Sequence, residues 1–183
     1  MYFKSAILMS TLATLVAACS SAPKAENVPP STEAKIVAQK EKASYVIEVS
    51  FDKGKSSLTT SAKDKIDEVM QRARRDGTIE DVKVIAWADA EYPSSAKKAL
   101  SKPQRQLADH RAKAINDYIK AQTQASIDTY NMAERPNAMQ KLMSSPDARI
   151  KRNLEEAGIA TTAHDLRYPE NASKAMMMVI LKE

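Results

Sequence analysis

Two oppositely charged residues, Asp89 and Arg111, stand where the surrounding pattern is apolar. Asp89 directly follows the apolar stretch 82–88, and Arg111 lies one helical turn after Leu107 and one turn before Ile115. A guanidinium beside an apolar stripe must find a partner, because burying it alone is costly. The positions of the two residues therefore indicate a polar site that joins a strand end to a helix.

Two interpretations of this pair remain open at the level of the residues. In the first, the Asp89 carboxylate and the Arg111 guanidinium form a structural salt bridge. In the second, both groups face a ligand that carries an amine and a carboxylate, since Asp suits an ammonium group and Arg binds a planar carboxylate. The residue pattern by itself favours the salt bridge.

The rest of the composition offers little for catalysis. The chain has two His, one Cys and three Gly, so we find no His and Cys cluster at metal-ligand spacing, no Gly-rich phosphate loop and no nucleophile elbow. The net charge of +5 is spread along the chain and suits solubility better than nucleic-acid binding. We therefore expect a protein that is not an enzyme and that has no metal, no cofactor and no nucleic-acid partner.

Hydrophobic periodicity predicts the elements that would position the pair. Alternation predicts a strand over 45–51, and apolar runs predict strands over 82–88 and 175–181. A short third strand is predicted over 126–130. Helices are predicted from Thr60 or Ser61 to Gly77, from Ser101 to about residue 119, and over 147–157. This order predicts an α+β domain, in which a sheet packs on helices and an additional helix precedes the last strand.

The N-terminus has the pattern of an export signal. One positive charge at Lys4 precedes the apolar run 6–16, which is too short for a membrane span of about 20 residues but fits a secretory signal. Residues 15–19 (LVAAC) resemble the lipobox of bacterial lipoproteins. The resemblance implies that residues 1–18 are removed and that Cys19 is acylated, which would attach the protein to a membrane.

The segment after Cys19 is predicted to be a tether. Residues 19–43 are rich in Ser, Ala, Pro, Lys and Glu and hold few large apolar side chains, although a short helix over 32–42 is compatible with them. Ser20 favours the outer membrane under the enterobacterial sorting rule. The predicted domain then spans residues 44–183.

Residues 45–119 resemble the first part of the OmpA-like C-terminal domain, a peptidoglycan-binding module. The motif positions are Phe51 and Asp52 at the end of the first strand, residues 86–89 (AWAD) where the family has Gly-His-Thr-Asp, and residues 104–112 (QRQLADHRA) on the second helix. The resemblance implies a β-α-β-α-β-(α)-β fold. It also implies that Asp89 and Arg111 contact the diaminopimelate of the peptide stem, with Phe51, Asp52 and Leu107 in the same site.

Several residues depart from the family pattern, and they define a second hypothesis. Ala86, Ala88 and Ala108 replace polar or small family residues, and the segment 137–171 is an insertion. The resemblance favours an outer-membrane lipoprotein that binds peptidoglycan and ties the envelope to the wall. The departures favour a lipid-anchored scaffold with a degenerate site, whose insertion 137–171 contacts an envelope protein.

Overall fold

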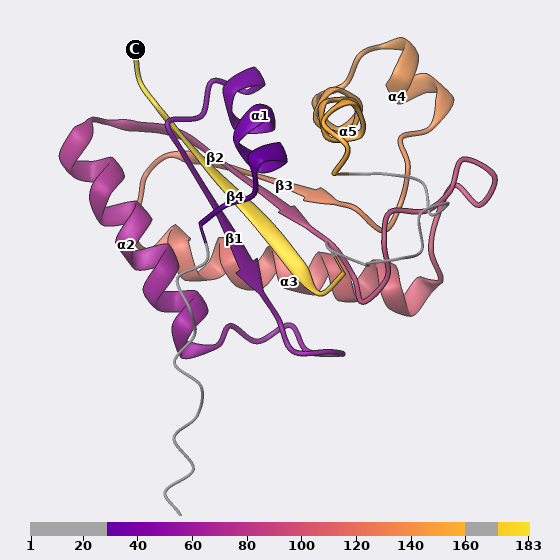
Figure 1. The fold of residues 1–183 in the computed structure, drawn as a ribbon, viewed down its shortest axis with the longest axis horizontal. Coiled ribbons are helices and arrows are strands. Elements are labelled where there is room, and N and C mark those ends of the chain that lie inside the picture. The colour runs from indigo at the N-terminus through magenta and orange to yellow at the C-terminus, as the bar shows by residue number, and fades with distance from the viewer. Residues whose placement is uncertain (1–28, 160–171) are drawn as a thin grey trace, which may run out of the picture.

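The computed structural model describes residues 29–159 and 172–183, which form one mixed β-sheet with helices on both faces (Figure 1). The elements in chain order are α1 (Thr32–Lys40), β1 (Tyr45–Ser50), α2 (Thr60–Asp76), β2 (Ile79–Ala86), α3 (Lys102–Lys120), β3 (Ser126–Asn131), α4 (Ala138–Leu142), α5 (Pro146–Glu156) and β4 (Lys174–Leu181). The α+β prediction is confirmed. The predicted signal peptide and Cys19 lie outside the described residues.

The four strands are ordered β1-β4-β2-β3. β4 pairs antiparallel with both β1 and β2, whereas β2 and β3 are parallel and are joined through α3. The last strand therefore lies in the interior of the sheet, which explains its continuous apolar sequence. Met176, Met177 and Met178 are all buried core residues, as their place in an apolar strand predicts.

One face of the sheet packs against α2 and α3. The helical stripe predicted for α2 is buried as expected and consists of Ala62, Ile66, Val69, Met70 and Ala73. The side chain of Thr59 caps this helix by accepting the N–H of Ala62, so α2 begins one residue before the predicted start. On α3, Ile115 and Ile119 are buried as expected, and Arg111 is buried with them.

The other face is covered by α1 and α5, and here the predicted tether must be corrected. Residues 32–40 form a helix whose Ala34, Val37 and Ala38 are buried against the sheet. These three residues share one helical face, and the sheet that they meet is itself apolar at Ile85 and Met178. Small side chains are therefore enough to fix α1 to the sheet, and the folded unit begins before residue 44.

The insertion contains two helices rather than one. α5 lies where a helix was predicted, and it packs on the sheet through Ile150 and Leu154. α4 was not predicted, because five residues are too few to show a helical period; its local signal is the capping box between Asn137 and Gln140. No helix within residues 29–159 and 172–183 is long and apolar enough to cross a membrane.

Candidate functional site

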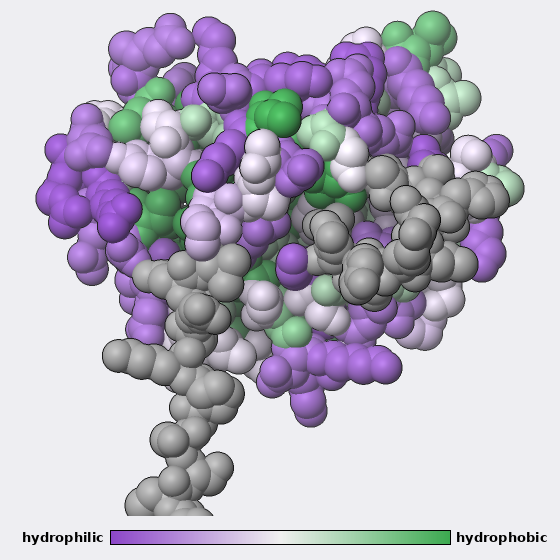
Figure 2. Space-filling view, viewed as in Figure 1, coloured by the Kyte–Doolittle hydropathy of each residue, from purple (hydrophilic) through white to green (hydrophobic). Residues whose placement is uncertain are grey.

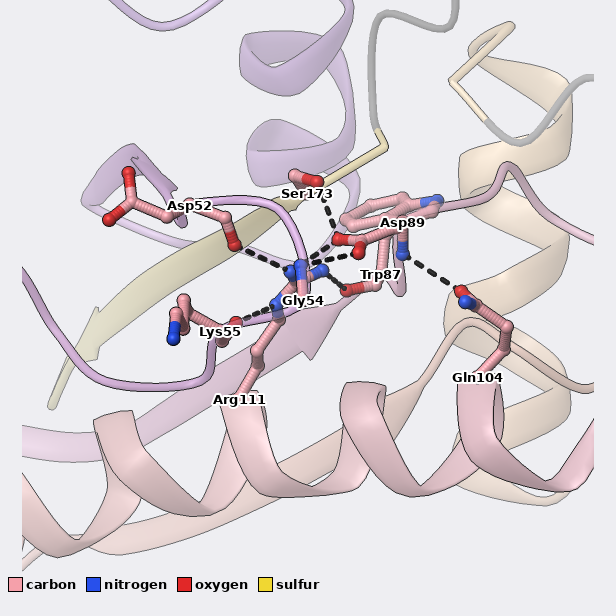
Figure 3. A network of polar contacts seen from close by, with 8 residues as sticks. All are labelled: Asp52, Gly54, Lys55, Trp87, Asp89, Gln104, Arg111 and Ser173. Atoms are coloured by element: carbon pink, nitrogen blue, oxygen red, sulfur yellow. Dashed lines mark hydrogen bonds and ion pairs between the residues drawn. The ribbon is translucent and has the colours of Figure 1, made fainter.

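Asp89 and Arg111 meet at one end of the sheet, within a network of polar contacts (Figure 3). Asp89 follows β2, and Arg111 reaches it from α3. The loop between β1 and α2 approaches from one side, and Ser173, directly before β4, approaches from another. The network thus joins four segments that are far apart in the sequence.

The guanidinium of Arg111 is completely excluded from solvent. Its Nε donates to the carbonyl of Lys55 at 2.9 Å, and Nη1 donates to the carbonyl of Trp87 at 2.9 Å. Nη2 donates to the carbonyl of Asp52 at 3.2 Å and to Oδ1 of Asp89 at 2.5 Å. Four of the five N–H groups of this side chain are therefore occupied within the protein.

The ring of Phe51 adds a further contact to the same guanidinium. The ring centroid lies 5.2 Å from Cζ of Arg111, which is within the range of a cation–π interaction. Because Phe51 is itself buried, this contact contributes to holding the positive charge in the interior. A buried guanidinium with this many partners is stabilised as an ion and is fixed in position.

Asp89 accepts three hydrogen bonds. Oδ1 accepts from Arg111 and from the hydroxyl of Ser173 at 2.7 Å, and Oδ2 accepts from the N–H of Gly54 at 2.5 Å. Burial acts to raise the pKa of Asp89, but the hydrogen bonds from Ser173, Arg111 and Gly54 outweigh it and hold the pKa below its usual value. The group is therefore a fixed carboxylate that stays ionised at neutral pH, and 11% of its side-chain surface is exposed.

A tight turn brings the N–H of Gly54 to this carboxylate. The N–H of Lys55 donates to the carbonyl of Asp52 at 3.0 Å, which closes the turn. Gly54 has φ of +70°, a left-handed conformation that glycine adopts without steric cost. The short sequence from Asp52 to Lys55 thus supplies one backbone donor to Asp89 and two carbonyl acceptors to Arg111.

The structure brings together most of the residues that the sequence placed in the site, but in different roles. Asp89 and Arg111 bind each other, which is the salt-bridge interpretation that the residue pattern favoured. Phe51 contacts Arg111 through its ring, and Asp52 contributes its carbonyl while its side chain stays exposed. Leu107 is half-buried one turn earlier on α3 and supplies no polar group to the network.

Sequence reasoning did not assign five further members of the network: Gly54, Lys55, Trp87, Gln104 and Ser173. Ser173 also binds both neighbouring segments through its backbone, because its N–H donates to Ala88 and its carbonyl accepts from Phe51. The side chain of Gln104 accepts the backbone N–H of Asp89 at 3.0 Å. The signal that could have identified Gly54 is its place two residues after Asp52, in a short polar loop.

Comparisons with known proteins do not assign the chain to a family. No protein-family model matches the sequence, and no curated protein matches it. Among solved structures, the fold is similar to the OmpA-like domain of FopA1 from Francisella tularensis subsp. tularensis SCHU S4, with a TM-score of 0.39 and 13% sequence identity. The match covers 75% of this chain and 73% of that chain. The two chains are too dissimilar for any residue's role to be transferred.

Proposed function

We propose that this chain is a lipid-anchored, non-catalytic protein of the bacterial envelope whose domain binds peptidoglycan non-covalently. In this proposal acyl chains on Cys19 hold one end in the outer membrane, and the domain contacts the wall from the periplasm. Asp89 meets the ammonium group of diaminopimelate in the peptide stem. The observation that carries the proposal is the Asp89 carboxylate itself, which is ionised, held in place and partly exposed.

The acceptor capacity of Asp89 is compatible with an ammonium ligand. An ionised carboxylate has about four lone-pair positions for hydrogen bonds. Two donors bind Oδ1 and one donor binds Oδ2, so Oδ2 keeps capacity for another hydrogen bond. A charge-assisted bond from an ammonium group would fill it without displacing any present partner.

Arg111 has a different role in this proposal from the one that the resemblance implies. Its guanidinium is fully buried and already binds three carbonyls and Asp89, so it is not accessible to a ligand carboxylate in this arrangement. We therefore assign Arg111 as a positioning residue that keeps Asp89 ionised and correctly oriented. The stem peptide then needs only its ammonium group for recognition at this site.

Co-sedimentation of the full chain with purified sacculi tests the proposal. Asp89→Asn keeps the size of the side chain and removes its charge, so we expect binding to be lost. Asp64→Asn, an exposed change on α2, serves as the matched control and should bind normally. Acetylation of the amino groups of the sacculi should also abolish binding by the unchanged protein. Retained binding by Asp89→Asn, with its fold verified by circular dichroism, would reject the assignment.

A second candidate function is supported by the insertion. Three large apolar side chains on and beside α4 are strongly exposed: Met139 at 63%, Leu142 at 83% and Met143 at 73%. Hydrophobic residues gather at the upper right of Figure 2, where Figure 1 places α4. Exposed apolar patches often mark contacts with other proteins. In this alternative the chain is an anchored scaffold, and the insertion contacts another envelope protein.

Photo-cross-linking from position 142 in the intact envelope separates the two functions. A single dominant protein adduct, together with no sacculus binding by the purified chain, would support the scaffold. Sacculus binding that depends on Asp89, with no protein adduct, would support the peptidoglycan function.

A further inference from the structure

The strand β3 forms one edge of the sheet, and half of its backbone groups face away from β2. Just beyond the strand, the N–H of Met132 donates to the carbonyl of Ala86 at 2.9 Å. Because backbone groups alternate in direction along a strand, the N–H and C=O groups of Tyr130 and Asp128 also face β2. The N–H and C=O groups of Ile127 and Thr129 therefore point to the open edge.

A groove of about 540 Å³ lies beside the C-terminal end of this edge. Thr129 and Asn131 of β3 line it, together with Asn116 of α3 on one side and Gln140 and Lys151 of the insertion on the other. Proteins usually block or cover an exposed strand edge. Here the edge instead lies at the base of a hollow between α3 and the inserted helices. This is the arrangement in which an extended peptide can add to a sheet as a further strand.

The charges of the groove indicate the kind of peptide that it would accept. The three cations that line it already pair with carboxylates of this chain, at 2.6, 2.8 and 2.8 Å: Lys113 with Asp117, Arg135 with Glu155 and Lys151 with Asp147. Within the described part of the chain, Asp109 and Asp128 form no ion pair. The Asp109 carboxylate accepts from the amide of Asn131 at 2.6 Å, and the Asp128 carboxylate accepts from the hydroxyl of Tyr130 at 3.4 Å. The lining itself carries three acids and three cations, so the negative excess next to the strand comes from Asp128, which lies on β3 outside the lining.

The two acids flank β3 on opposite faces of the sheet. Asp109 lies on α3 and contacts Asn131, whose side chain shares a face with Ile127. Asp128 shares the other face with Tyr130, which packs against the layer of α1 and α5. In an added strand, neighbouring side chains also point to opposite faces. Two adjacent cationic residues of a bound peptide would therefore meet one acid each.

We propose that the open edge of β3 binds an extended segment of another protein by strand addition, and that this segment carries adjacent Lys or Arg residues. Backbone hydrogen bonds to Ile127 and Thr129 supply the affinity. Asp109 and Asp128 select the cationic side chains. The site uses none of the residues around Asp89, so it is a second binding site beyond the proposed contact with the wall.

The test measures binding of a fluorescent peptide, Thr-Val-Thr-Lys-Arg-Thr-Val-Thr, to the full chain in detergent by fluorescence anisotropy. We expect saturable binding that weakens as salt is added. Thr129→Pro removes one outward N–H without touching the bonds to β2, and it should weaken binding about tenfold, the loss of one hydrogen bond. Thr129→Val keeps the N–H and should bind normally. Asp109→Asn combined with Asp128→Asn should weaken binding and reduce its salt dependence.

A change in the peptide tests the same contact on the unchanged protein. Methylation of the backbone nitrogens of the central Lys and Arg removes their hydrogen-bond donors, and it should abolish binding even if Thr129→Pro fails to fold. Equal affinity for the methylated and unmethylated peptides, or no binding of either, would overturn the proposal. Sacculus binding should be the same for Thr129→Pro and Thr129→Val, because the two sites are separate.

Discussion

The carboxylate of Glu41 lies 2.5 Å from the ammonium group of Lys83, and the two side chains are only 2% and 8% exposed. Glu41 ends α1, and Lys83 lies in the middle of β2. The amide of Asn153 on α5 also donates to Glu41 at 2.6 Å, and Arg149 lies 3.5 Å from it. One buried carboxylate therefore joins α1, the sheet and the inserted helix α5.

Removing one charge of this pair should destabilise the fold strongly. Lys83→Met leaves the Glu41 carboxylate buried without its main partner, so we expect the free energy of unfolding to fall by about 3–5 kcal/mol. Combining Lys83→Met with Glu41→Leu should recover part of the loss, because neither charge is then buried alone. Urea denaturation measures both. As a control, Glu156→Gln breaks the exposed pair with Lys40 and should change stability by about 0–1 kcal/mol.

The lowered pKa of Asp89 predicts an acid-dependent loss of stability. A carboxyl whose pKa is lower in the folded than in the unfolded state stabilises the fold above its usual pKa, here 3.8, and loses this contribution as the pH falls through the folded value. In Asp89→Asn this acid dependence should be weaker, and the melting temperature at pH 7 should be lower. Melting curves between pH 7 and pH 2 test this. If the melting temperature fell equally steeply with falling pH in the unchanged protein and in Asp89→Asn, the prediction would be contradicted.

Asp81 should behave in the opposite way. Burial and the nearby Asp128 raise the pKa of Asp81, and its buried Oδ1 has no hydrogen-bond partner among the described residues. A raised pKa means that the folded state favours the protonated form, so this contribution to stability is lost as the pH rises through the folded pKa. Asp81→Asn should therefore raise the melting temperature at neutral pH. A lower melting temperature for this variant at pH 7 would show that the Asp81 charge is stabilising.

The packing of α1 predicts a contrast between two adjacent residues. Val37 is fully buried against the sheet, whereas Ile36 is 41% exposed. Val37→Asp buries an unpaired charge and should lower the free energy of unfolding by about 3 kcal/mol or more, whereas Ile36→Asp should have little effect. Thermal melts of the two variants compare them directly. Equal melting temperatures would mean that α1 is not fixed to the sheet.

The proposed anchor at Cys19 predicts a covalent lipid. Cells that express the chain and are fed radiolabelled palmitate should label the native protein, and Cys19→Ser should abolish the label and release the protein from the membrane fraction. Ser20→Ala changes the neighbouring residue and should keep the label. Labelling of Cys19→Ser would place the lipid elsewhere.

The sequence alone was enough to predict the elements that pack on the sheet through a regular period. The buried stripe of α2 and the alternation of β1 repeat an apolar residue at the spacing of a helix or strand, so each reports which face is buried. The sequence also singled out Asp89 and Arg111, because each interrupts such a pattern. Where the period is short or built from small residues, as in α4 and α1, the sequence missed the helix or assigned it to a tether.

Only the tertiary structure decided what the charged residues do. Sequence placed Asp89 and Arg111 near each other but left open whether they bind a ligand or one another. The answer depends on the Asp52–Lys55 turn and on Ser173, which come from distant parts of the chain and occupy further hydrogen-bonding positions of the two groups. A buried charge forms hydrogen bonds with the groups that the fold places beside it. Those groups recur at no regular spacing in the sequence.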